Sequence, residues 1–178
     1  MRLTLGSRPY DLTTRALVMG TVDRAGSVAH AVEEGADIVE VETLGAGTDP
    51  GVPTCVAPAG EAGVAAALAA GASLVRLGAG ISPATYRSCG AAGAAVLVAG
   101  GADGTGAAEA AGMSSDRIVV DGGTPGGRYP VLVDVTGAPC PAAATAVAVV
   151  RGARIVRTAD IRGALRICDV LAAVWEAQ

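Results

Sequence analysis

The feature that most constrains this chain is a series of short apolar runs of strand length, separated by segments of helical length. Each run is bounded by Gly, Pro or Asp and is apolar nearly throughout, which is typical of strands buried on both faces of a parallel sheet. The eight runs are Ala16–Thr21, Asp37–Glu42, Thr54–Ala57, Ser73–Leu77, Ala95–Ala99, Arg117–Asp121, Pro130–Val135 and Arg154–Thr158. Alternating strands and helices predict a parallel sheet, and eight strands favour a closed barrel.

Ala-rich segments between these runs predict helices. The helices are expected from Asp23 or Ser27 to Glu34, over Glu61–Ala70, from Ser82-Pro83, from Asp103 or Thr105 to Gly112, from Pro141 to about Arg151, and after Asp160. Two connections, Thr43–Pro53 and Gly122–Tyr129, are too short or too rich in Gly and Pro for a helix. The expected fold class is α/β: a pared-down (β/α)8 TIM-type barrel with one or two helices missing, occupying residues 1–178 as one domain.

Composition excludes several classes of protein. The 178 residues carry a net charge of −4, so nucleic acid is not an expected partner, because binding phosphates requires a basic face. Charged residues and Gly interrupt every apolar stretch, so we expect no membrane association and no export signal. The four cysteines form no CxxC pair and there is one His, which disfavours a zinc site and indicates a reducing, cytoplasmic compartment.

Several stretches, in order along nearly the whole chain, resemble the dihydropteroate synthase family of pterin-binding barrels. LTLGSRPYDLTTRALVMG is similar to the family's N-terminal hairpin and first strand, and EEGADIVEVE, which follows His30, is similar to its first helix and second strand. AAGMSSDRIVVDGG, YPVLVDVTG and GARIVRTADIRGAL resemble the segments around strands six, seven and eight. The resemblance implies a barrel that joins a pterin pyrophosphate to p-aminobenzoate in folate biosynthesis.

Against the family's pattern, this sequence has lost most of the synthase site. The chain contains no Asn and no Lys, so the pterin-binding asparagines and the lysine after strand seven are absent. Arg76 stands where an Asp follows strand four, and Ala159 stands at the histidine position after strand eight. The first loop is reduced to residues 21–26, and the second, over residues 44–51, lacks its arginine. Each unmade buried hydrogen bond costs about 1–3 kcal/mol, so we expect synthase activity to be lost.

The residues that remain at strand ends are candidates for binding a pterin-like or phosphorylated small molecule. They are Asp121, Arg157, Glu40 and Arg76, and no residue is assigned a catalytic role. For Asp121 the alternative is a loop-capping aspartate, and for Arg157 it is an ion pair with Asp160 or Glu40. Glu40 and Glu42 are two positions apart on a strand and face the same side, which favours an ion-pair cluster with Arg76 and Arg157 over a general acid and base.

The remaining candidate residues receive structural interpretations. We expect Asp160 to cap the last helix and His30 to face other elements of the fold. Asp23 and Asp134 are either remnants of a site or ordinary solvated residues. The tracts Gly45–Gly51 and Gly100–Gly106 lack the context of a phosphate-binding loop and are read as shortened loops.

Three functions remain open at this stage. The first is a non-catalytic ligand-binding or partner subunit without a cofactor. The second is an active synthase, for which Mg²⁺ is the candidate cofactor. The third is a different barrel enzyme with Glu40, Glu42 and Asp121 holding a divalent metal. Loss of the sixth helix would expose the apolar outer faces of Arg117–Asp121 and Pro130–Val135, so a homodimer or hetero-complex is expected, with Trp175 beside the interface.

Overall fold

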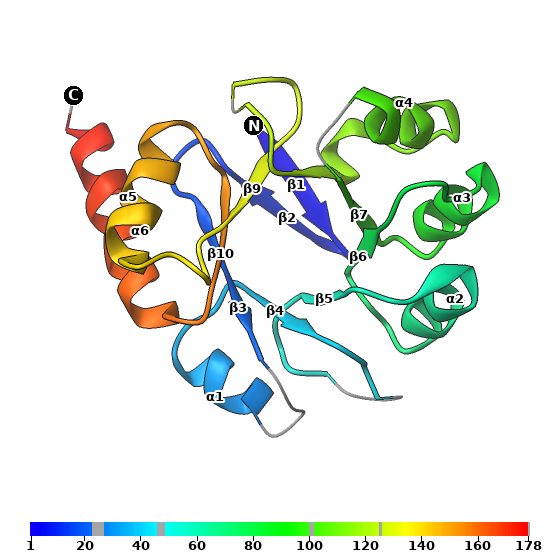
Figure 1. Cartoon of the computed structure of the whole chain (residues 1–178), viewed down its shortest axis with the longest axis horizontal. Helices are drawn as coiled ribbons and strands as arrows, with labels where there is room; N and C mark the ends of the chain where they lie inside the picture. The colour runs from blue at the N-terminus through cyan, green and yellow to red at the C-terminus, as the bar shows by residue number, and fades with distance from the viewer. Residues whose placement is uncertain (23–26, 46–48, 100–101, 125, 178) are drawn as a thin grey trace.

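The computed structural model contains a closed barrel of eight parallel strands, and it describes residues 1–22, 27–45, 49–99, 102–124 and 126–177. The barrel strands, in spatial order, are β10 (Ile155–Thr158), β3 (Leu17–Thr21), β4 (Ile38–Val41), β5 (Thr54–Val56), β6 (Leu74–Leu77), β7 (Ala95–Ala99), β8 (Ile118–Asp121) and β9 (Val131–Asp134). All eight predicted strands are present, and the predicted (β/α)8 TIM-type barrel is confirmed (Figure 1).

Six α-helices surround the barrel in the described part of the chain. They are α1 (Ser27–Glu33), α2 (Gly60–Ala69), α3 (Pro83–Ala91), α4 (Ala102–Ala110), α5 (Pro141–Val150) and α6 (Ile161–Glu176), with a 3-10 turn at Ser115–Arg117. Two start signals are seen directly: the Ser82 hydroxyl accepts from the Thr85 amide, and the Asp160 carboxylate accepts from the Gly163 amide. The predicted helix cap at Asp160 is therefore confirmed.

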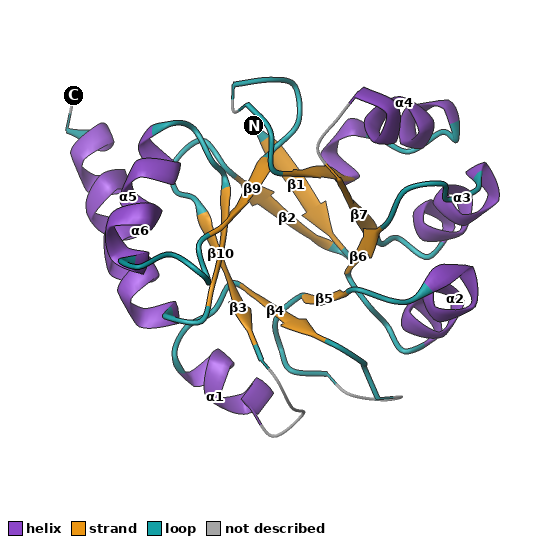
Figure 2. Cartoon of the chain, viewed as in Figure 1, coloured by secondary structure: helices purple, strands orange, loops and turns teal. Residues whose placement is uncertain are grey.

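The ring of helices has two breaks, one between α1 and α2 and one between α4 and α5 (Figure 2). They coincide with the connections Thr43–Pro53 and Gly122–Tyr129, in whose described residues no helix is present. The sequence prediction of two helix-free connections is thus confirmed within the described residues.

The expected exposure of the strands beside the second break is wrong. On the outer faces of β8 and β9, Ile118 and Val131 are buried and Val120 and Val133 are half-buried. Tyr129, from the connecting segment, lies against the same hydrophobic core. The segment therefore covers apolar surface that a helix would otherwise cover.

Alternation along each strand divides the apolar side chains into two layers. One layer lies between the barrel and the helices and includes Val39, Val56 and Val156. The other fills the barrel interior, with Met19, Ile38, Leu74, Leu97, Val119, Leu132 and Ile155 all fully or almost fully buried. The barrel is therefore a packed core in its lower part, not a channel.

An N-terminal hairpin closes the end of the barrel where the strands begin. Strands β1 (Arg2–Leu5) and β2 (Arg8–Asp11) pair antiparallel, and Leu3, Leu5 and Leu12 join the interior core. The Thr4 hydroxyl donates to Asp116 at 2.6 Å, and Arg117 donates to the Gly6 carbonyl. These contacts hold the hairpin against the barrel floor.

If the hairpin is part of the core, Leu3→Ala will lower the free energy of unfolding by about 2–5 kcal/mol, because it removes a fully buried side chain. The control is Val150→Ala on α5, where the side chain is 63% exposed and the expected change is below about 0.5 kcal/mol. Urea denaturation measures both. Equal, small losses would show that the hairpin folds independently of the barrel.

Candidate functional site

A layer of charged side chains lies directly above the apolar interior, at the carboxyl ends of the strands. Each member follows a buried apolar residue by two positions on its strand, so both point into the barrel. The pairs are Ile38 and Glu40, Leu74 and Arg76, Val119 and Asp121, Leu132 and Asp134, and Ile155 and Arg157. We refer to Glu40, Arg76, Asp121, Asp134 and Arg157 as the charged layer.

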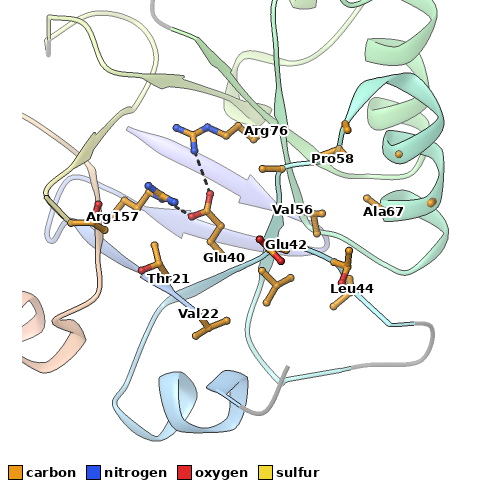
Figure 3. A pocket seen from close by; sticks show the side chains of 17 residues that line it. Thr21, Val22, Glu40, Glu42, Leu44, Val56, Pro58, Ala67, Arg76 and Arg157 are labelled. Carbon is orange, nitrogen blue, oxygen red and sulfur yellow. Dashed lines mark hydrogen bonds and ion pairs between the residues drawn. The ribbon is translucent and has the colours of Figure 1, made fainter. Parts of the chain in front are cut away.

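Glu40 is the centre of the charged layer and is only 6% exposed. Its Oε2 accepts a hydrogen bond of 2.5 Å from Arg157 Nε, and its Oε1 lies 3.5 Å from Arg76 Nη1 (Figure 3). Arg76 also donates to Asp121, and Arg157 also donates to Asp134. Both arginines therefore bridge two carboxylates, and five of the eight strands are linked through one network.

Two members of the network, Arg157 and Asp134, have shifted pKa values. Burial alone opposes the charge on Arg157, but its hydrogen bonds with Glu40 and Asp134 outweigh burial and raise the pKa of Arg157. For Asp134, burial raises the pKa, but hydrogen bonds from Thr136 and Arg157 outweigh it, so the pKa lies below its usual value. Both shifts favour the charged forms of the Arg157–Asp134 pair.

Below the charged layer lies Cys55, fully buried and paired in register with Glu40. Burial, reinforced by the nearby Glu40 charge, strongly raises the pKa of the Cys55 thiol. Since a thiolate is the reactive form, this cysteine is an inert core residue.

A cavity of about 910 Å³ opens above and beside the charged layer. Its polar lining comes from Glu40, Arg76 and Arg157, together with Glu42 at the rim and the hydroxyls of Thr21, Thr43 and Thr136. A cavity of this size is within the range of small-molecule sites, and it lies at the end of the barrel where such folds bind ligands.

The structure brings together all four candidate ligand-binding residues. Glu40, Arg76, Asp121 and Arg157 lie in one network, and the expected ion-pair cluster is present. Whether they bind a ligand stays a prediction. Asp134, which sequence reasoning left open, is a full member; its position two residues after Leu132 was the available signal.

Three sequence interpretations need correction. Glu42 does not join the network: β4 ends at Val41, and Glu42 is exposed at the cavity rim. Of the two partners expected for Arg157, Glu40 is confirmed and Asp160 is not, and Asp134 is a second partner. His30 does not face other elements, because its side chain is 67% exposed, 3.5 Å from Glu34.

The hypothesis of a divalent metal on Glu40, Glu42 and Asp121 gains no support. Among the described residues, no three His, Cys, Asp or Glu side chains are grouped to hold a metal ion. Arg76 lies between Glu40 and Asp121, with a hydrogen bond to Asp121 and an ion pair with Glu40.

The sequence candidate Asp23 lies outside the described residues. No helix within the described ranges is long and apolar enough to cross a membrane.

The fold and the position of the cavity define a TIM-type barrel with a polar site at the carboxyl ends of its strands. No protein-family model matches the sequence, and no curated protein matches it either.

Solved structures do match, and they have the fold of dihydropteroate synthases. The Stenotrophomonas maltophilia enzyme with active site-bound imidazole is 22% identical, with a TM-score of 0.74 over 99% of both chains. The Xanthomonas albilineans enzyme in complex with 7,8-dihydropteroate is 21% identical, with a TM-score of 0.77 over 98% of both. The Burkholderia cenocepacia enzyme complexed with 7,8-dihydropteroate is 22% identical, with a TM-score of 0.77 over 99% of this chain and 97% of the other.

Removing one partner of an ion pair leaves the other charge buried without its partner, which is destabilising. Arg157→Gln is expected to lower the free energy of unfolding by about 2–3 kcal/mol, somewhat less than for a fully buried pair, since Arg157 is 22% exposed. Arg162→Gln, whose side chain is 63% exposed in its pair with Glu34, should cost about 0–1 kcal/mol.

A double-mutant cycle separates the pair from the single residues. Glu40→Gln combined with Arg157→Gln should be less destabilising than the sum of the two single changes. Additive losses in urea denaturation would mean that the Glu40–Arg157 contact contributes no coupling energy.

Proposed function

We propose that this chain is a non-catalytic small-molecule-binding protein, or the ligand-binding subunit of a complex, with a dihydropteroate-synthase-like fold. The observation that carries the proposal is the position of Arg76. Its guanidinium donates a hydrogen bond to Asp121 and forms an ion pair with Glu40, at the strand ends where the fold binds its ligands.

The loss of synthase chemistry follows from what surrounds these acceptors. A pterin needs a carboxylate and amides to pair its donor and acceptor edge, and the chain has no Asn. A pterin would also compete with Arg76 for Asp121, because one oxygen of that carboxylate already accepts from the guanidinium. Buried polar groups left unpaired cost about 1–3 kcal/mol each, so several such losses remove orders of magnitude in rate.

An active synthase is the alternative. It is favoured by the cavity of about 910 Å³ and by the presence of Asp121 and Arg157 at the mouth. It requires Asp121 to accept from the substrate while one of its oxygens is bonded to Arg76, or Arg76 to move. In that case the enzyme would join a pterin pyrophosphate to p-aminobenzoate in folate biosynthesis.

Of the two ligand classes considered, a pterin-like molecule agrees better with the site than a phosphorylated one. A phosphate requires guanidinium donors, and both arginines of the cavity are already paired with carboxylates. A neutral heterocycle brings N–H donors, which carboxylates accept. Titration of the protein with a pterin, followed by pterin fluorescence, measures this binding separately from catalysis.

We predict no dihydropteroate formation from pterin pyrophosphate and p-aminobenzoate, with Mg²⁺ supplied, when an active synthase is assayed in parallel. The reason is the missing Lys and Asn together with the occupied Asp121. Turnover within about a hundredfold of the ~10 per second of a typical enzyme would overturn the proposal in favour of the alternative.

Assembly is proposed to involve the α5–α6 side of the barrel. These helices pack against each other, and they carry the exposed valines Val147, Val150, Val170 and Val174. Apolar surface on neighbouring helices is typical of an interaction site. This replaces the groove beside β8 and β9, whose outward-facing apolar residues are at least half-buried.

We predict a homodimer by size-exclusion chromatography with light scattering at micromolar concentration. Val150→Glu combined with Val170→Glu should shift it to monomer, because it places charges on the proposed interface. Ala173→Glu, at an exposed position of α6 without a large apolar side chain, is the comparison. A monomeric parent protein that captures no partner would contradict this assembly.

A further inference from the structure

The cavity extends beyond the charged layer into a second, apolar arm. This arm lies where a helix between β4 and β5 is absent among the described residues, so the outer faces of both strands and one face of α2 border it (Figure 3). It is lined by Val41, Leu44, Val56, Pro58, Ala66 and Ala67. The cavity is therefore one compartment with a charged end and an apolar end.

Carboxylates outnumber guanidiniums at the charged end when Asp121 and Asp134, which pair with the two arginines but do not line the cavity, are counted. The two guanidinium groups of Arg76 and Arg157 face the carboxylates of Glu40, Asp121 and Asp134, and each guanidinium bridges two of them. Glu42 adds a fourth carboxylate at the rim and makes no ion pair among the described residues. An anionic ligand would have to break existing pairs and approach this excess of negative charge.

A second observation points to a hydrogen-bond donor in the ligand. Glu40 is only 6% exposed, and its Oε1 accepts no hydrogen bond from any described residue. The nearest cation, Arg76 Nη1, is 3.5 Å away, and Arg76 keeps its bond to Asp121 if that contact opens. Glu40 Oε1 has almost no exposed surface, so a ligand N–H group reaches it only when Arg76 moves aside. A buried acceptor without a hydrogen-bond donor is unfavourable, so this exchange would be favoured.

We propose that this compartment binds an organic cation with an apolar body. An amidinium or guanidinium head would lie against Glu42 and Glu40, and the body would occupy the arm against Leu44, Val56 and Ala66. This rests on the proposed small-molecule role but names a ligand class and a second subsite for it. Arg76 competes with the ligand for Glu40. A ligand is therefore favoured when its hydrogen bond to Glu40 is stronger than the 3.5 Å ion pair between Arg76 and Glu40.

The test compares three probes with the same aromatic body: naphthalene-2-carboxamidine, naphthalene-2-carboxamide and naphthalene-2-carboxylate. They carry one positive charge, no charge and one negative charge at neutral pH. In calorimetric titrations of the full chain, the amidine should bind at least about tenfold more tightly than the carboxamide, and the carboxylate most weakly. Pterin binding is measured on the same samples.

Two variants assign the binding to the two ends of the compartment. Glu42→Gln and Ala66→Leu should each weaken amidine binding about tenfold, by removing the rim charge and by filling the arm. Their matched controls are Glu176→Gln and Ala65→Leu, exposed positions on α6 and α2 that do not line the cavity. These should change affinity less than about twofold. Circular dichroism confirms that each variant folds.

The outcomes separate this inference from the proposed function. Carboxylate binding as tight as the amidine would overturn the inference, since the arginines would then act as an anion site. Amidine binding that neither variant weakens would place the probe elsewhere and also overturn it. If pterin binds and no naphthalene probe does, the inference fails and the small-molecule role stands. If neither pterin nor any probe binds, both fail.

Discussion

The interactions of Glu40 with Arg157 and Arg76 are the ones on which the upper half of this barrel depends. A carboxylate that is 94% buried is costly unless it is paired, and Glu40 is paired from both sides of the barrel. Because each arginine also binds a second carboxylate, the network joins β4, β6, β8, β9 and β10. The same contacts that stabilise the fold also set the charge of the cavity, so stability and ligand choice are coupled at this layer.

The lower half depends on a different principle. Below Glu40 the interior is filled by Met, Leu, Ile and Val side chains, and the N-terminal hairpin adds Leu3, Leu5 and Leu12 to that core. A closed barrel has no sheet edge, so its strands satisfy their backbone groups without needing every outer helix. This explains how the chain keeps eight strands with six helices in its described part. Beside the first break, the outer faces of β4 and β5 line the cavity. Beside the second break, the connecting segment covers the outer faces of β8 and β9.

The barrel itself was predictable because its signals are local. Apolar runs of strand length, helix caps such as Ser82 and Asp160, and two Gly- and Pro-rich connections all survive in the structure. The charged layer was predictable in part, since strand periodicity places Glu40, Arg76, Asp121 and Arg157 on the inner face. Glu42 follows the same periodicity but lies beyond the end of β4, where alternation no longer fixes direction. Pairing was less accessible: the link from Arg157 to Asp134 joins neighbouring strands and needs three-dimensional register.

The identity of the ligand is where sequence reasoning was weakest, and the reason is physical. Absence of Lys and Asn excludes interactions, but it does not say what the remaining groups prefer to bind. That preference depends on which charges are already neutralised, and only the structure shows that both cavity arginines are engaged while Glu42 is not. An arginine count suggests an anion site, whereas the same arginines in their pairs leave an excess of carboxylate. The sign of the field follows from the excess of carboxylates over guanidiniums, and the pairing shows where that excess lies, at Glu42 on the cavity rim.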